Sequence, residues 1–251
     1  MNEHLTHDAF LGGLLHLRQP KKGYRAGVDP VLLAASVAAG AGQTVLDVGC
    51  GAGAAALCLA QRVSGLEVHG IEIQPFYADL AVRNAAENGL QLTVHQGDIS
   101  EMPDALKARR FDHVITNPPY YDRASGHKSG NIGRELALGG ASLDLWLQAC
   151  ARRLAPKGTL TLICRTERMP ELLSAMPSYL GSIELWPLIP RQGRASELSL
   201  LRARHGGRTP FCLHDGQLVH LGANHAKDGE SYSKSIASVL REGAALPFPK
   251  S

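Results

Sequence analysis

The stretch Asp47-Val48-Gly49-Cys50-Gly51-Ala52-Gly53-Ala54 decides the fold of this 251-residue chain. The apolar, β-rich run Thr44–Val48 leads into it, and the alanine-rich run Ala54–Val63 follows it. A buried strand that meets a tight glycine turn and then a helix is typical of an α/β unit. Glycines also let a ligand approach the main chain closely. The stretch therefore predicts a parallel sheet with a binding site where its first strand ends.

The alternation of strands and helices continues along the chain. We expect further strands over Leu66–Ile73, Leu90–Asp98, Phe111–Asn117 and Thr159–Cys164, and helices over Val31–Ala39, Pro75–Asn88 and Leu143–Leu154. Two later runs, Ile183–Leu188 and Glu197–Ala203, are expected to close the sheet as a hairpin. This order indicates an α/β fold with an open, mostly parallel sheet, a final antiparallel strand and helices on both faces.

Three segments are expected along the chain. Residues 1–42 form an N-terminal lead-in, residues 43–205 the core, and residues 206–251 an extension packed on the core. Within the extension, Pro210–Gly222 is expected to form a short hairpin with Asp215-Gly216 at its turn, and Ser231–Glu242 a last helix.

Composition excludes several classes of protein. With 44% hydrophobic and 20% charged residues, the chain is globular rather than disordered or fibrous. The net charge of +3 is too small for an electrostatic nucleic-acid coat, although it allows a local basic patch. Five cysteines without a CxxC pair argue against a disulfide framework or a zinc site. Without an apolar span or a signal peptide, we expect a cytoplasmic protein with no membrane and no metal site.

Acidic residues follow three of the expected strands. Asp47 ends the first strand, Glu72 the second, and Asp98 comes just after the third, so all three are expected to meet in one crevice. The turn also fits G-x-G-x-x-A, the dinucleotide fingerprint, but a pyrophosphate would be repelled by three carboxylates. S-adenosylmethionine carries a positive sulfonium and no phosphate, so acids suit it. The alternatives are an NAD-linked oxidoreductase and a tight connection whose acids are solvated.

The fourth strand ends in Asn117-Pro118-Pro119-Tyr120, the most specific string in the chain. Two prolines after a strand stiffen the turn and remove two backbone donors. They would present two acceptors, the Asn117 side-chain oxygen and the Pro118 carbonyl, to the two donors of a planar –NH₂ group. Acceptors held in place favour the charged transition state of methyl transfer to such a nitrogen, and Tyr120 would pack on the planar target. The alternative is a strand-ending turn with a core tyrosine.

These motifs together resemble a known family. The runs VLDVGCGAG, IEIQP, GDI and NPPY are similar to those of the class I S-adenosylmethionine-dependent methyltransferases that methylate exocyclic or amide nitrogens. That resemblance implies a Rossmann-like fold. The segment Gln19–Ala35 and the C-terminal runs GRASELSLLRARHGG and YSKSI resemble the bacterial tRNA-1-valine adenine-37 N-methyltransferase family, which is related to the protein-glutamine release-factor methyltransferases. The Gly-rich run RASGHKSGNIGRELALGG departs from the family pattern.

The resemblance implies roles for particular residues. Asp47, Gly49 and Gly51 would hold the methionine part of S-adenosylmethionine, Glu72 its ribose, and Asp98 with Ile99 its adenine, with Ile73 and Asn117 as further cofactor contacts. Asn117, Pro118 and Tyr120 would be catalytic and hold the target nitrogen. The lead-in lies over the methyl donor in such families, so Tyr24, Arg25 and Asp29 become candidates for lining the site.

The motifs leave the acceptor open between adenine in RNA, adenine in DNA and glutamine in a protein. The chain lacks the extra domains usual in the DNA and release-factor enzymes, which favours tRNA or another structured RNA. A nucleotide-binding module without catalysis is a further alternative. We expect the segment from Tyr121 to Gly140 to be mobile. The basic residues available for RNA are Lys21, Lys22, Arg25, Arg123, Lys128, Arg134, Arg191, Arg194, Arg202, Arg204 and Arg208.

Overall fold

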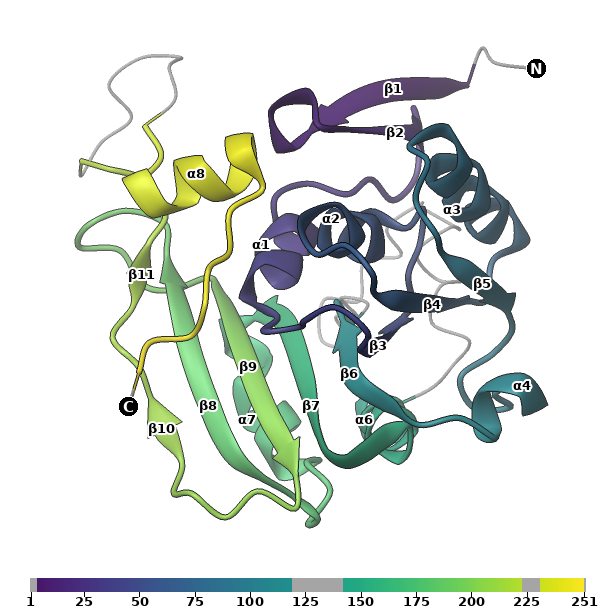
Figure 1. Ribbon diagram of the computed structural model, residues 1–251. Coiled ribbons are helices and arrows are strands. Elements are labelled where there is room, and N and C mark those ends of the chain that lie inside the picture. Colours follow the sequence, from purple (N-terminus) through teal and green to yellow (C-terminus); the bar gives the residue numbers. More distant parts are fainter. Residues whose placement is uncertain (1–3, 119–141, 223–230, 251) are drawn as a thin grey trace.

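A nine-stranded sheet forms the centre of the protein in a computed structural model that describes residues 4–118, 142–222 and 231–250. Its strand order is β10-β8-β9-β7-β6-β3-β4-β5, and β11 also pairs with β8 (Figure 1). The strands are β3 (Thr44–Val48), β4 (Glu67–Glu72), β5 (Thr93–Gln96), β6 (Phe111–Thr116), β7 (Leu154–Arg165), β8 (Leu180–Ile189), β9 (Leu198–His205), β10 (Cys212–Leu213) and β11 (Gln217–Leu218).

Strand direction confirms the expected fold class. Strands β3 to β7 are parallel to one another, and β9 runs antiparallel to both β7 and β8. The strand order reverses at β3, because β4 and β5 extend the sheet to one side and β6 and β7 to the other. Open α/β sheets bind ligands at such a reversal, outside the carboxyl ends of the strands.

Helices cover both faces of the sheet. Three helices contribute apolar residues that pack with Val45, Ile115 and Ile163: α1 (Asp29–Ser36), α2 (Ala54–Arg62) and α8 (Lys234–Glu242). On the other face, α6 (Leu143–Arg152) and α7 (Met169–Ser174) pack with Leu46, Val114 and Leu162. Side chains that alternate along each strand thus fill two separate cores. Two further helices, α3 (Pro75–Glu87) and the short α4 (Asp104–Lys107), flank β4, β5 and β6 (Figure 1).

The lead-in contains a hairpin that the sequence analysis did not predict. Strands β1 (Leu5–Phe10) and β2 (Leu15–Pro20) pair antiparallel, with the short 3-10 helix η1 (Leu11–Gly13) at the tip. Two side-chain amides, one in α3 and one on the residue that caps it, occupy the outer edge of β2. Asn84 accepts from Arg18 N–H and donates to Arg18 C=O, and Asn88 does the same with His16. The spacing of residues four apart on a helix thereby matches the spacing of residues two apart on a strand.

The expected hairpin over Pro210–Gly222 is wrong. Both β10 and β11 pair with β8 in parallel, so the chain continues along one edge of β8 and does not turn back. A two-residue hairpin of the expected type needs a positive φ at both central residues, and neither Asp215 nor Gly216 has one. The exposed edge of β8 offers the hydrogen bonds that a hairpin partner would otherwise supply.

Some boundaries also differ from the sequence expectation. The third parallel strand, β5, spans only Thr93–Gln96, and β7 begins at Leu154 and includes the Pro156-Lys157-Gly158 turn through a register shift. The later pair β8 and β9 and the last helix α8 are confirmed. Among the described residues, no helix has the length and apolarity that crossing a bilayer requires. No group of His, Cys, Asp or Glu in the same residues is arranged as metal ligands.

Candidate active site

The glycine turn after β3 lies at the reversal point of the sheet. The N–H groups of Gly49 and Cys50 donate to the Ile71 carbonyl at 2.9 and 3.1 Å, which ties the turn to β4. Gly49 has φ +74°, and a side chain there would meet the Trp146 ring at 3.0 Å. Trp146 in turn donates through Nε1 to Thr116 Oγ1 at 3.0 Å, and that hydroxyl donates to the Val48 carbonyl. The ends of β3 and β6 are therefore held together beneath the turn.

Asp47 is a buried carboxylate at the end of β3. Its Oδ2 accepts from the N–H of Ala56, in the first turn of α2, at 3.2 Å. Burial raises the pKa of Asp47 to about 7, the Ala56 hydrogen bond opposes that rise, and the nearby Glu72 adds to it. A carboxylate in this condition gains stability from a cationic ligand.

Glu72 is a second buried carboxylate, at the end of β4. Its Oε2 accepts from Gly51 N–H and its Oε1 from Gln74 N–H, both at 2.9 Å, so the side chain joins the glycine turn to the start of α3. Burial raises the pKa of Glu72 despite these bonds. Neither Asp47 nor Glu72 has an ion-pair partner in the described part of the chain. Two buried acids without a cation favour a ligand that brings positive charge and hydrogen-bond donors.

Asp98 and Ile99 lie beside Glu72. The backbone bond from Gly97 N–H to the Glu72 carbonyl, 3.0 Å long, brings the end of β5 against the end of β4. Asp98 is half-buried and caps its own loop by accepting from Ser100 N–H at 2.8 Å. Ile99 packs against the apolar core that contains α6, and Ile73 is half-buried next to Glu72. The three predicted acids are thus at the ends of three adjacent strands.

Asn117 and Pro118 follow β6 directly, next to the glycine turn across the β3–β6 pair. The Asn117 side chain forms a hydrogen bond with the phenol of Tyr24. Tyr120 and the segment from Tyr121 to Gly140, including Arg123, Lys128 and Arg134, lie outside the described residues. The structure therefore brings the described members of the predicted Asn-Pro-Pro-Tyr motif to the predicted crevice.

Tyr24 lies over the glycine turn. A side chain added at Gly51 would touch the Tyr24 ring at 3.6 Å. The backbone of Tyr24 is clamped by the Tyr77 hydroxyl, which accepts from its N–H at 2.9 Å and donates to its carbonyl at 3.1 Å. Burial first, and then the charges of Asp29 and Asp47, raise the pKa of Tyr24 to about 12. The phenol is therefore protonated at neutral pH.

The other two lead-in candidates separate in the structure. Asp29 begins α1, and its charge acts on Tyr24. Arg25 instead pairs with Asp8 at 2.7 Å and donates to the Pro20 carbonyl, so its guanidinium stabilises the hairpin. Sequence reasoning missed Trp146, Tyr77 and Asn84. Aromatic side chains at helical spacing are normally core residues, so the sequence carried no signal for their contacts with the turn.

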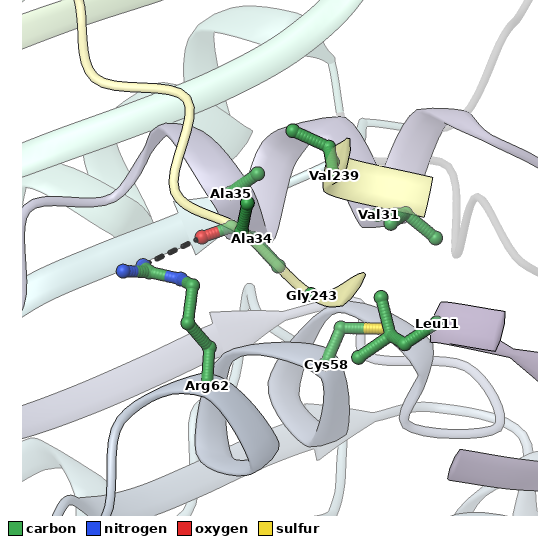
Figure 2. A pocket seen from close by; sticks show the side chains of 9 residues that line it. Leu11, Val31, Ala34, Ala35, Cys58, Arg62, Val239 and Gly243 are labelled. Atoms are coloured by element: carbon green, nitrogen blue, oxygen red, sulfur yellow. Dashed lines mark hydrogen bonds between the residues drawn. The ribbon is translucent and has the colours of Figure 1, made fainter. Parts of the chain in front are cut away.

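The hollow shown in Figure 2 lies apart from this site. It is enclosed by η1, α1, α2 and α8, and Arg62 donates there to the Ala34 carbonyl at 3.0 Å. Arg62 also donates to the Val37 carbonyl at 2.6 Å, so its guanidinium caps the C-terminal end of α1. The apolar lining and this cap indicate a structural junction.

The comparisons with known proteins agree with the geometry. Residues 39–187 match a family model described as a methyltransferase domain. The tRNA1(Val) (adenine(37)-N6)-methyltransferase of Actinobacillus succinogenes is 30% identical over 74% of this chain and 79% of that protein. The protein of the same name from Haemophilus influenzae is 30% identical over 84% of this chain and 89% of its own length.

A solved structure from Agrobacterium tumefaciens, described as a "predicted O-methyltransferase", is similar over most of the fold. It superposes with a TM-score of 0.71 at 25% identity, covering 88% of this chain and 99% of that one. A solved structure of nearly the same extent therefore shares the fold.

Proposed function

Because the chain belongs to the methyltransferase domain family and, within it, to the tRNA1(Val) (adenine(37)-N6)-methyltransferases, we propose that it transfers a methyl group from S-adenosylmethionine to the exocyclic amine of adenine in tRNA. The observation that carries the proposal is the position of Asn117-Pro118. These two residues follow β6 beside the glycine turn, where the two buried carboxylates Asp47 and Glu72 lie at neighbouring strand ends.

The cofactor supplies an electrophilic methyl group when it is bound. Asp47 and the glycine turn would hold its methionine part, Glu72 its ribose, and Asp98 with Ile73 and Ile99 its adenine. The Asn117 side-chain oxygen and the Pro118 carbonyl would accept hydrogen bonds from the two N–H groups of the target amine. Those bonds keep the amine in line with the methyl donor and strengthen as positive charge develops on the nitrogen.

A nitrogen acceptor also fits the ionisation of the site. An alcohol acceptor needs a general base with a pKa near the working pH. The Tyr24 phenol, which is hydrogen-bonded to Asn117, has a pKa raised to about 12. The exocyclic amine of adenine can lose its proton after methyl transfer, when it is far more acidic. Tyr24 is therefore unsuited to be the base that an oxygen acceptor, as in the description of the Agrobacterium protein, would need.

RNA is favoured as the carrier of the adenine by the names of the relatives, which are tRNA-modifying enzymes. Protein glutamine presents the same planar amide and is the second acceptor to test. The proposal also places the enzyme in the cytoplasm, where tRNA is found, and its five cysteines are all free thiols.

The test is methyl transfer from labelled S-adenosylmethionine to an unmodified tRNA1(Val) transcript and to the same transcript with guanine at position 37. We expect N6-methyladenosine from the first and no label in the second. Asn117→Ala should lower kcat by about 100-fold, the usual loss when one group that stabilises charge in the transition state is removed. The melting temperature and cofactor affinity of the variant show whether the loss is chemical.

The matched control is Arg83→Gln, an exposed residue on α3, which should leave kcat unchanged. Label in a protein glutamine and none in RNA would replace adenine by glutamine as the acceptor. Cofactor binding with no label in tRNA, protein or DNA would contradict the proposal and support a binding module.

A further inference from the structure

The edge of the sheet opposite the active site carries a dense group of positive charges. Four segments meet there: residues 107–110 before β6, 150–158 before and within the start of β7, 175–182 before and within the start of β8, and 204–210 at and after the end of β9. Together they contain no Asp or Glu, and we call their cationic residues the basic edge: Lys107, Arg109, Arg110, Arg152, Arg153, Lys157, Arg204 and Arg208.

Backbone contacts hold these segments side by side. Phe111 N–H donates to the Arg153 carbonyl at 2.7 Å, and Gly206 N–H donates to the Tyr179 carbonyl at 2.8 Å. Arg204 donates through Nε to the Lys157 carbonyl at 3.2 Å. The positive charges therefore share one surface of the fold, although the first and the last of these residues are about 100 positions apart in the sequence.

Few carboxylates neutralise this surface. Lys107 pairs with Asp104, and Arg109 pairs with Glu67. The carboxylate of Asp112 accepts from Thr44 at 2.9 and 3.0 Å. Within the described residues, no ion pair reaches Arg110, Arg152, Lys157, Arg204 or Arg208, all of which are exposed. Their like charges repel one another, and burial together with Arg110 and Arg152 lowers the pKa of Arg153. A polyanion would relieve that repulsion.

The surface also has aromatic rings and a constrained backbone. Tyr179 is 39% exposed, and its ring lies 5.4 Å from that of His205. Lys157 has φ +66°, a left-handed conformation that is unusual for a residue with a side chain. This conformation sets the carbonyl to which Arg204 donates. Exposed rings between cations are typical of nucleic-acid surfaces, where they stack on bases or sugars.

The described residues of the active-site edge are poorly suited to bind phosphates alone. It holds Asp47, Glu72 and Asp98, and after β7 its arginines alternate with glutamates: Arg165, Glu167, Arg168 and Glu171. The two edges are separated by the length of a strand, about 20 Å for the six residues of β6. A folded RNA arm is long enough to lie across both edges.

We propose that the basic edge binds the phosphate backbone of the RNA substrate at a distance from the methylated base. This inference rests on the proposed RNA acceptor. It also corrects the basic set expected from sequence, because Arg202 pairs with Glu184 at 2.6 Å and lies over the Phe248 ring. The exposed residues Arg110, Arg152 and Lys157 take its place beside Arg204 and Arg208.

The test compares two triple variants that each remove three positive charges. Arg110→Gln, Arg152→Gln and Arg204→Gln change the basic edge. Arg83→Gln, Lys234→Gln and Lys250→Gln change exposed cations elsewhere and serve as the control. Binding of an unmodified tRNA transcript is measured over a range of salt concentrations, with melting temperature and cofactor affinity as checks on folding.

We expect the basic-edge variant to bind tRNA roughly 10-fold more weakly at physiological salt, with a salt dependence shallower by about 2 in the slope of log K against log salt. Its KM for tRNA should rise by a similar factor, whereas the control triple variant keeps the affinity, the slope and kcat.

The outcomes separate the two proposals. Equal tRNA affinity and slope for both variants, with methylation intact, would overturn the basic edge and leave the proposed function in place. If the unchanged protein methylates no RNA but the basic-edge variant loses tRNA binding, the proposed function is overturned and the basic edge remains. Equal loss of binding to duplex DNA would overturn the assignment to RNA.

Discussion

At the scale of single residues, the site depends on what burial does to Asp47. Folding raises the pKa of this carboxyl from 3.8 to about 7. Its contribution to stability is therefore present below pH 3.8 and is lost as the pH rises through about 7. The cofactor-free protein retains a destabilising carboxylate at neutral pH, which is common for groups that act in binding.

We predict that this ionisation makes cofactor binding depend on pH. Below about pH 7 Asp47 is protonated, and a cationic ligand must release that proton to bind. Affinity for S-adenosylmethionine should therefore rise with pH by up to about 10-fold per unit below that value, and calorimetry in buffers of different ionisation enthalpy should detect the released proton. In the Asp47→Asn variant, the pH dependence of S-adenosylmethionine binding should vanish together with most of the affinity. The same pH dependence in both proteins would contradict this role for Asp47.

Tyr24 illustrates a second residue-scale effect. Its phenol is bonded to the Asn117 side chain, and its pKa of about 12 keeps it protonated. Tyr24→Phe should lower kcat by about 5-fold, the value of one hydrogen bond of ~1 kcal/mol, with KM for the cofactor little changed. The pH–rate profile should keep its shape because the phenol does not titrate in the working range. If the variant lacks an ionisation that the unchanged protein shows in its pH–rate profile, Tyr24 acts as a base instead.

At the scale of elements, α3 positions the lead-in over the glycine turn. Asn84 is fully buried and bridges two of its neighbours, because its amide donates to Arg18 in β2 and to the Ala52 carbonyl in the turn. Tyr77, two turns earlier, clamps Tyr24. One helix thus connects the hairpin, the segment over the site and the glycine turn.

We predict that Asn84→Leu destabilises the protein by about 3 kcal/mol, because it leaves buried backbone groups of Arg18 and Ala52 unpaired. Urea unfolding measures the loss. Asn88→Leu is the matched control, since Asn88 makes the equivalent bonds to His16 at a more exposed position. Its loss should be about 1 kcal/mol. Equal losses would show that burial of the Asn84 amide is unimportant.

At the scale of the whole molecule, the N-terminal hairpin meets the C-terminal helix α8. The tip of the N-terminal hairpin lies against the end of α8, where Gly12 abuts the Arg241 carbonyl without room for a side chain. Leu246 N–H also donates to the Ala35 carbonyl of α1 at 2.8 Å. The hollow in Figure 2 lies within this junction. The C-terminal segment therefore supports the hairpin that holds Tyr24 over the site.

We predict that Gly12→Ala loosens this junction. The residue has φ +66°, and its new side chain would meet backbone atoms, so stability should fall by about 2 kcal/mol. Hydrogen exchange should accelerate in β1, β2 and α8, and cofactor affinity should fall several-fold. Gly13→Ala is the control, because it has a similar positive φ with open space around it. Identical exchange in both variants would contradict coupling between the ends.

The sequence by itself determined the α/β fold and the residues at the ends of β3, β4, β5 and β6. Those features are local, because a glycine turn between an apolar strand and a helix, and an acid directly after a strand, depend on neighbours in the chain. Parallel pairing then brings such strand ends to one edge, so the crevice with Asp47, Glu72 and Asn117 could be predicted.

The tertiary structure decided what depends on partners far apart in sequence. Asn84 completes the edge of β2 across 66 residues, Tyr77 clamps Tyr24 across 53, and the edge of β8 takes up β10 and β11 in place of a hairpin. The basic edge likewise exists only once four separate segments meet. Hydrogen-bond partners and like charges brought together by folding leave no periodic pattern in the chain, which is the physical reason why these features could not be predicted from it.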